Sequence, residues 1–179
     1  MTNQPATRYA THVHSSAQVV QACLWKIPTL VLLRDPRGAV CGDIAFGCEL
    51  AERDPQIVKP SEVDDSLHRY IAFYERIETF NQGFFIGHFP EVTKDFGAVM
   101  KSFNEYFGTE FVIFEHTKEA ADKITSMSFH MGPRANRNAI KAVVNGKYDQ
   151  EASMELKDRA QRVYERILKL KGIDAASRS

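Results

Sequence analysis

The sequence predicts an α/β fold in which helices cover a parallel sheet. Two short apolar runs, Thr29–Leu33 (TLVLL) and Phe84–His88 (FFIGH), are typical of buried strands. The first run is almost continuously leucine and β-branched, which is the pattern of a central parallel strand that is apolar on both faces. Helical patterns separate and follow the two runs, and this alternation favours a parallel sheet layered with helices.

Each helix in the first part of the chain is predicted from its spacing and its end signals. Residues 15–25 form a short helix before the first strand. Apolar and aromatic side chains recur at helical spacing over 64–80 and predict an amphipathic helix there. After the second strand, one helix is expected to start at Pro90 and to end at Gly108, because proline suits a first helical turn and glycine a helix end.

The C-terminal half is predicted to be helical. A helix over 117–128 is followed by a turn over 129–138, which is rich in glycine, proline and arginine. A short helix then runs to about Val144, and the terminal helix spans roughly 151–171.

The length suits one domain over residues 1–179. We expect residues 1–8 to be a loose leader and 172–179 a frayed tail. The stretch 48–65 (CELAERDPQIVKPSEVDD) is polar and contains two prolines, which indicates a flexible loop.

The composition argues against several classes of function. Lysine and arginine number 23, as do aspartate and glutamate, so the formal net charge is +0 and no broad surface for nucleic acid is expected. No apolar run is long enough to span a membrane, and the first twenty residues lack a signal-peptide pattern. The three cysteines form no CxxC pair, which argues against disulfides and structural zinc. We therefore expect a cytoplasmic protein with no membrane partner.

The stretch TLVLLRDPRGAV, residues 29–40, carries the strongest chemical signal. Arg34 follows the first strand, Asp35 and Pro36 end that strand, and Gly38 lies where a helix begins. Ligands of parallel α/β sheets bind at the carboxyl ends of the strands, where an arginine and the N–H groups of a helix N-terminus suit a phosphate or a sulfate. The structural alternative is a salt bridge between Arg34 and Asp35.

This stretch resembles the 3′-phosphate-binding motif of sulfotransferases that use 3′-phosphoadenosine 5′-phosphosulfate (PAPS). In that family a Thr-His pair precedes the motif, as Thr11 and His12 precede Arg34 here, with a short helix between them. The resemblance covers most of the chain from Thr11 on. Three later blocks are similar to the family's later elements and its adenine-contact region: YIAFYERI, FFIGHFPEVTKDFGAVMKSFNEYFG and ITSMSFHMGPR.

The resemblance implies a P-loop-NTPase-like three-layer sandwich that transfers a sulfuryl group from PAPS to a hydroxyl of a small molecule or a glycan, without a metal. It implies that His12 is the catalytic base, since an imidazole can accept the hydroxyl proton at neutral pH. The residues that it places at the nucleotide are Arg34, Gly42, Ser128, Phe129 and Arg134.

The chain also departs from the family pattern. The glycine-rich loop that binds the phosphosulfate is absent, because none of the ten glycines lies in a GxxxxGK[ST] pattern or a similar one. Gly42 stands where the family has a serine, and Ala10 where it has a basic residue. We therefore expect an N-terminally incomplete fold that binds the nucleotide weakly or not at all.

Alternative interpretations remain open. The chain could be a non-catalytic remnant that acts as a binding or oligomerisation module, or a nucleotide or phosphate-ester enzyme of another P-loop-like class. His12 and His14 could ligate a metal, but no third ligand is evident. An incomplete sheet would expose an edge beside residues 29–33, so we expect the protein to form a homodimer or to be poorly soluble as a monomer.

Overall fold

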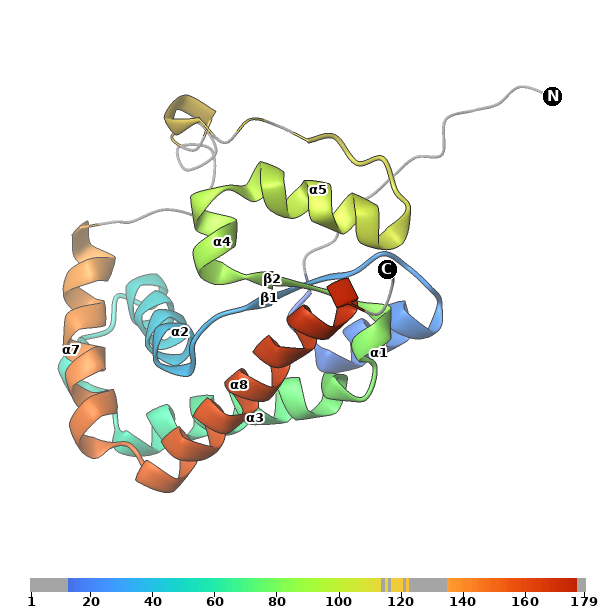
Figure 1. Ribbon diagram of the computed structural model, residues 1–179. Helices are drawn as coiled ribbons and strands as arrows, with labels where there is room; N and C mark the ends of the chain where they lie inside the picture. The colour runs from blue at the N-terminus through green and yellow to red at the C-terminus, as the bar shows by residue number, and fades with distance from the viewer. Residues whose placement is uncertain (1–12, 114, 116, 121, 123–134, 177–179) are drawn as a thin grey trace.

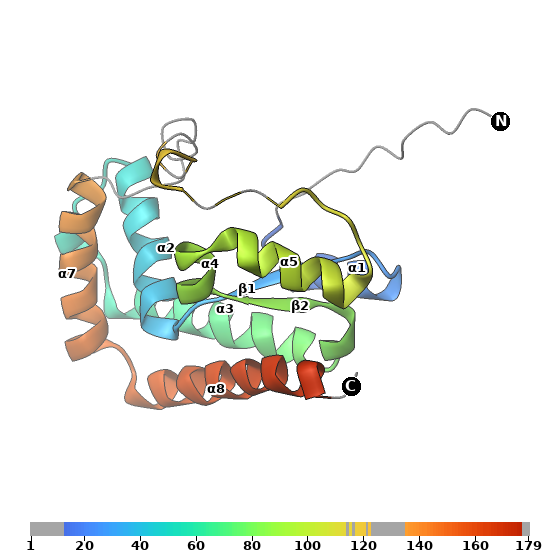
Figure 2. The ribbon, with the colours of Figure 1, turned by 45° about the horizontal axis from the view of Figure 1, so that its top comes forward.

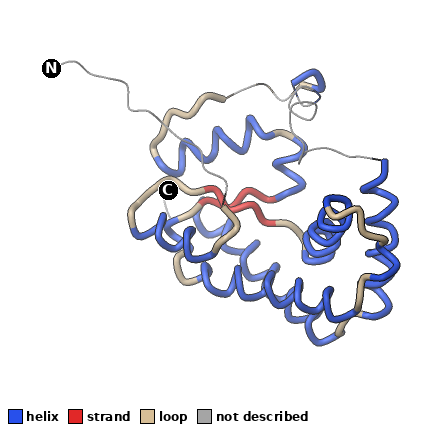
Figure 3. The backbone as a smooth tube through the Cα atoms, turned by 180° about the vertical axis from the view of Figure 1, so that it is seen from behind, coloured by secondary structure: helices blue, strands red, loops and turns tan. Residues whose placement is uncertain are grey.

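The computed structural model describes residues 13–113, 115, 117–120, 122 and 135–176, which are mostly helical around a small parallel sheet (Figure 1). Figure 3 shows the two strands side by side, with helices around them. The elements are α1 (Ser16–Leu24), β1 (Leu30–Leu33), α2 (Pro36–Leu50), the 3-10 turn η1 (Pro55–Ile57), α3 (Pro60–Glu78), the 3-10 turn η2 (Asn81–Gly83), β2 (Phe85–His88), α4 (Phe89–Lys94), α5 (Phe96–Phe107), α7 (Ala135–Glu151) and α8 (Met154–Ala176).

Both predicted strands are confirmed, and they pair in parallel. The register runs from Leu30 opposite Phe85 to Leu33 opposite His88. The strand side chains alternate between the faces of the sheet, and Leu33 on one face is fully buried. Leu32 on the other face is 46% exposed, so the prediction that β1 is buried on both faces is wrong at this residue.

Helices lie on both sides of the sheet. Figure 1 and Figure 2 show α4 and α5 on one side and α3 with α8 on the other. On the first side, the Phe85 ring of β2 meets the Phe103 ring of α5 at 6.0 Å between centres. On the second side, an ion pair of 2.8 Å joins Arg159 of α8 to Glu75 of α3. With two strands in the described part, this is a mostly helical α/β arrangement and not a clear three-layer sandwich.

Helices α2 and α7 form an antiparallel pair beside the sheet (Figure 2). Arg37 in the first turn of α2 binds Asp149 near the end of α7, with 2.6 Å between Nη2 and Oδ2. At the opposite end, Arg137 of α7 donates from Nε to Glu49 of α2 at 2.6 Å. These two pairs fix the register of the helices, and Val144 is fully buried between them.

The predicted loop over 48–65 is shorter in the structure. Helix α2 continues to Leu50 and α3 already begins at Pro60, so only residues 51–59 connect them. The Glu62 carboxylate explains the early start of α3, because it accepts the Lys59 N–H at 2.8 Å and binds Arg53 at 2.6 Å.

Three helix boundaries also differ from the prediction. The helix predicted to run from Pro90 to Gly108 is split at Asp95, whose carboxylate caps α5 by accepting the Ala98 N–H at 3.0 Å. Gly108 ends α5 as predicted, with a φ of 63°. The other two differences concern α7, which runs to Glu151 instead of Val144, and α8, which continues to Ala176 instead of ending near residue 171.

The helix predicted over 117–128 and the turn predicted over 129–138 lie mostly outside the described residues. Across the described part, every helix is either too short or too polar to span a lipid bilayer.

Candidate anion-binding site

The predicted order of strand, arginine and helix N-terminus is confirmed at Arg34. Arg34 is the first residue after β1, and α2 begins two residues later with Pro36 in its first turn. The Asp35 carboxylate caps α2 by accepting the Gly38 N–H at 2.6 Å. Arg34 therefore lies at the carboxyl end of a parallel strand, next to the N-terminus of a helix.

The Arg34 side chain contacts the Phe89 ring and lies beside two glycines and the Asp35 carboxylate. Its guanidinium carbon lies 4.2 Å from the centre of the Phe89 ring, at the start of α4. A Cβ added to Gly38 would come within 2.9 Å of Nε, and one added to Gly42 within 3.3 Å of Nη1. The two glycines lie one helical turn apart; the guanidinium fills the space at Gly42, and it shares the space at Gly38 with the Asp35 carboxylate, whose Oδ2 lies 2.5 Å from that Cβ position. Gly42 was predicted to contact the nucleotide, and the structure places it against Arg34.

The guanidinium of Arg34 has no anionic partner among the described residues. Its Nε is buried and has no hydrogen-bond acceptor there. The alternative interpretation, a salt bridge between Arg34 and Asp35, is not supported, because the Asp35 carboxylate caps α2 and the two side chains form no ion pair. A positive charge beside a helix N-terminus is unfavourable unless an anion compensates it.

The charge of Arg34 acts on a second cation, Lys141 of α7. Lys141 is partly buried and forms no ion pair or hydrogen bond within the described ranges. Burial lowers the pKa of its amino group, and the positive charge of Arg34 lowers this pKa further. The charge of the Asp35 carboxylate acts in the opposite direction. The Cys41 thiol adds no charge, because burial raises its pKa to about 11 and keeps it neutral.

Two tyrosines of α3 hold the end of β1 in place. The Tyr70 hydroxyl donates to the Arg34 carbonyl oxygen at 2.8 Å, and the Tyr74 hydroxyl donates to the Leu32 carbonyl oxygen at 2.7 Å. Carbonyls alternate in direction along a strand, and these two point away from β2. Burial raises the pKa of both tyrosines well above the ordinary value, so their hydroxyls stay donors at neutral pH.

His88, which ends β2 at the same edge of the sheet, contacts one side chain of α8 and one of α4. Its Nε2 lies 2.8 Å from the Tyr164 hydroxyl of α8, and its Nδ1 lies 3.9 Å from a Glu91 carboxylate oxygen. The Tyr164 contact ties β2 to α8, and the Glu91 contact is with the adjoining α4, which agrees with a structural role for His88.

The structure places only some of the predicted site residues in contact with one another. Arg34 and Gly42 are in contact, whereas four others lie outside the described residues: His12, Ser128, Phe129 and Arg134. Sequence reasoning missed Phe89, whose ring contacts the Arg34 guanidinium. Phe89 directly follows a predicted strand end, which is a usable signal.

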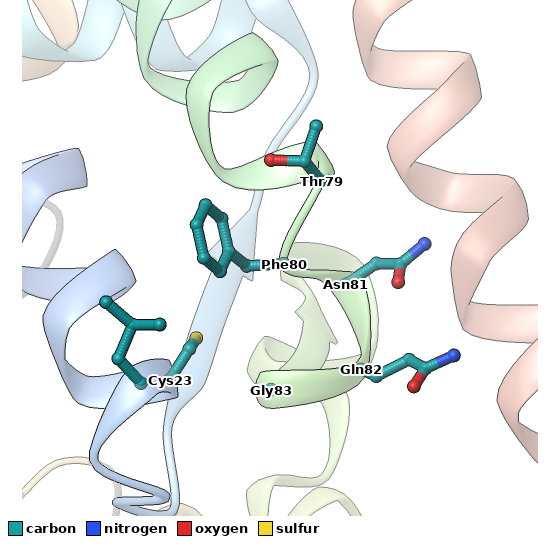
Figure 4. Close-up of a pocket in the computed structure, with 7 residues that line it drawn as sticks. Cys23, Thr79, Phe80, Asn81, Gln82 and Gly83 are labelled. Atoms are coloured by element: carbon teal, nitrogen blue, oxygen red, sulfur yellow. The ribbon is translucent and has the colours of Figure 1, made fainter.

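A separate hollow of about 420 Å³ lies at the other end of the sheet, between α1 and η2 (Figure 4). Its one thiol, Cys23, has a pKa raised by burial, and a Cβ at Gly83 would come within 2.6 Å of the Cys23 Cβ. The polar side chains of Asn81 and Gln82 point away from Cys23 in Figure 4. This hollow therefore has no group arranged to bind or activate a ligand.

No cluster of three or more His, Cys, Asp or Glu side chains in the described part of the chain is arranged to hold a metal ion. No protein-family model matches the chain, and comparisons with curated proteins and with solved structures find no match either. The inference of function therefore depends on the sequence motif and the geometry around Arg34.

Proposed function

We propose that this protein is sulfotransferase-like and binds the 3′-phosphate of PAPS at Arg34, in an incomplete form of the P-loop-NTPase-like three-layer sandwich. The observation that supports this proposal is the guanidinium of Arg34, which lies at a strand end beside a helix N-terminus and forms no ion pair with any described residue. Arginine presents a planar set of donors that matches a phosphate group.

The proposed reaction transfers a sulfuryl group to a hydroxyl of a small molecule or a glycan. The acceptor oxygen forms a bond to sulfur, the bond from sulfur to the 5′-phosphate oxygen breaks, and His12 takes the hydroxyl proton. Arg34 positions the donor through the phosphate at its 3′ end. The helices on both sides of the parallel sheet support the layered fold that this proposal needs.

We expect the nucleotide to bind weakly. Each charge-assisted contact is worth ~1.5–3 kcal/mol, and the sequence has no glycine-rich loop to supply the contacts to the 5′-phosphosulfate. Adenosine 3′,5′-bisphosphate should therefore bind through the Arg34 end alone, with an affinity weaker than micromolar.

Calorimetric titration with adenosine 3′,5′-bisphosphate tests the proposal. Arg34→Ala should abolish binding, whereas the matched control Arg166→Ala should not, because Arg166 forms an exposed ion pair with Glu78 on the α3 and α8 side. Labelled PAPS with phenolic, alcohol and sugar acceptors then tests transfer. Equal binding by Arg34→Ala and the wild-type chain would contradict the proposal.

A non-catalytic module that self-associates is the second candidate function. Large apolar side chains are exposed in the segment that leads into β1 and on β1 itself: Leu24, Trp25, Ile27 and Leu32. Sedimentation velocity separates the candidates, since self-association that is lost in Trp25→Ser, together with no response to the nucleotide, favours the module.

A further inference from the structure

We propose that the turn between α1 and β1, residues 24–28, is a membrane-contact site that inserts Trp25 into the surface of an anionic lipid bilayer. The turn precedes β1, whereas Arg34 follows it, so this inference does not rest on the proposed function. A contact of this kind lies in the headgroup region and needs no spanning helix. It departs from the expectation of no membrane partner.

Three large apolar side chains of the turn face solvent. Leu24 and Trp25 are each 67% exposed, and Ile27 is 47% exposed. Figures 1 and 2 show the turn at one end of the molecule, where the chain passes from α1 to β1. Helix α1 itself is fastened to the core by Val19, which is buried. The turn therefore presents an apolar surface from a fixed base.

Backbone hydrogen bonds hold the turn in one conformation. The Lys26 N–H donates to the Cys23 carbonyl oxygen at 3.0 Å. The Ile27 N–H donates to the Ala22 carbonyl oxygen at 2.9 Å, and these two bonds form the Schellman motif that ends many helices. The Thr29 hydroxyl then donates to the Ile27 carbonyl oxygen at 2.7 Å. The apolar side chains are thus exposed by an ordered turn and not by fraying of the helix end.

Lys26 occupies the position that is usually glycine in this motif. Its φ is 56°, in the left-handed region that is unfavourable for any residue with a Cβ. The side chain that replaces glycine here is exposed and places a positive charge between Trp25 and Ile27 in the sequence. Tryptophan and lysine together are typical of membrane–water interfaces, where the ring lies among the headgroups and the amino group reaches the lipid phosphates.

The charges near the turn suit an anionic surface. All 23 acidic residues of the chain lie after Arg34, so the turn and α1 contain none. The hollow of Figure 4, which begins beside Leu24, is lined by uncharged residues only. An anionic bilayer would therefore attract Lys26 and meet no carboxylate in α1, in the turn or in the lining of the hollow.

The extent of the apolar surface favours a bilayer over a protein partner. A stable protein interface takes about 20–30 residues from each side. This turn presents three large apolar side chains, which is too few to hold a second copy. A bilayer needs no matching surface, because each apolar side chain can enter the lipid by itself.

Trp25 is the single tryptophan of the chain, so its fluorescence reports insertion of this turn directly. Vesicles of equal parts phosphatidylcholine and phosphatidylserine should shift the emission of the full chain to shorter wavelength, and brominated lipid should quench it. Trp25→Ser should weaken co-sedimentation with these vesicles at least tenfold. The matched control Met154→Ser should bind like the wild-type chain. Met154 is 66% exposed, but it begins α8, whose first turn lies at the opposite end of the molecule (Figure 1).

Lys26→Gly separates the effect of the charge from an effect on folding. Glycine adopts the left-handed conformation without strain, so this variant should be at least as stable to urea as the wild-type chain. It should nevertheless bind the mixed vesicles about fivefold more weakly, which corresponds to the ~1 kcal/mol that one lysine contributes near an anionic surface. Lys26→Arg should retain the binding.

The inference is overturned if the mixed vesicles leave the Trp25 emission unchanged, if Met154→Ser loses as much binding as Trp25→Ser, or if Lys26→Gly binds like the wild-type chain. A second copy is the alternative occupant. An emission shift that follows protein concentration without lipid, with self-association that Trp25→Ser abolishes, would assign the turn to a protein interface and would also overturn the inference. The fluorescence test uses the wild-type chain, so it does not depend on the folding of Trp25→Ser.

Discussion

Replacing Arg34 by methionine should leave the free energy of unfolding nearly unchanged, although Arg34 is partly buried. Methionine retains an unbranched apolar stem that can lie on the floor formed by Gly38 and Gly42, and it removes only the guanidinium. A structural salt bridge would respond differently, because breaking a buried ion pair costs about 3–5 kcal/mol.

The expected change follows from two opposing contributions. The variant loses the contact of the guanidinium with the Phe89 ring, at 4.2 Å from the ring centre, which is worth about 0.5–1 kcal/mol. It also removes a positive charge from a helix N-terminus, which gains about 0.3–1 kcal/mol, and it relieves the repulsion with Lys141. The two contributions nearly cancel, so we expect a change of less than about 1 kcal/mol.

Urea unfolding measured by circular dichroism provides the assay, and Arg137→Met provides the matched control. Arg137 and Glu49 form an ion pair with side chains only 15% and 11% exposed, so this control should lose about 3 kcal/mol. For a chain of this size, 1 kcal/mol corresponds to a shift of about 2–4 °C in Tm. A loss of about 3 kcal/mol in Arg34→Met would show that Arg34 is a structural residue and would refute the reasoning.

Three further predictions concern stability and reactivity. Tyr74→Phe should lower the free energy of unfolding by about 1–2 kcal/mol in urea, because the Leu32 carbonyl loses its donor at 2.7 Å; an unchanged midpoint would contradict this. Glu62→Gln should lower the free energy of unfolding by about 1 kcal/mol at pH 7. Because Arg53 lowers the pKa of Glu62 to about 2, this difference between the variant and the wild-type chain should disappear as the pH falls from about 4.5 towards 2. Cys41, with its pKa raised to about 11, should react with a thiol reagent only after unfolding, and labelling of the native protein would refute that.

The part of the site that is local in sequence could be predicted. Arg34, Asp35 and Gly38 follow one another at a strand end, so the order of residues already defines the geometry of the turn. The capping bond from the Gly38 N–H to Asp35 is likewise a consequence of neighbouring residues. Both strands were predictable for the same reason, because each is a single short apolar run.

The other contacts of the site depend on segments that are distant in the sequence, and a local sequence pattern does not contain them. The contact of Phe89 with Arg34, for example, depends on the parallel pairing of β1 with β2, which places Leu33 opposite His88. The loop over 48–65 was predicted too long, because the proline at position 60 was interpreted as a breaker. In the structure Pro60 occupies the first turn of α3, and the combination with Glu62 two residues later was a usable helix-start signal.

The groups that hold Arg34 explain why its charge is available to a ligand. Its ring contact is Phe89, its floor consists of Gly38 and Gly42, and its carbonyl is bound by the Tyr70 hydroxyl. None of these groups carries a negative charge. The Asp35 carboxylate also lies against Gly38, but it accepts the Gly38 N–H and forms no ion pair with Arg34. The ring, the glycines and the tyrosine keep Arg34 oriented before a ligand arrives, which reduces the ordering cost of binding.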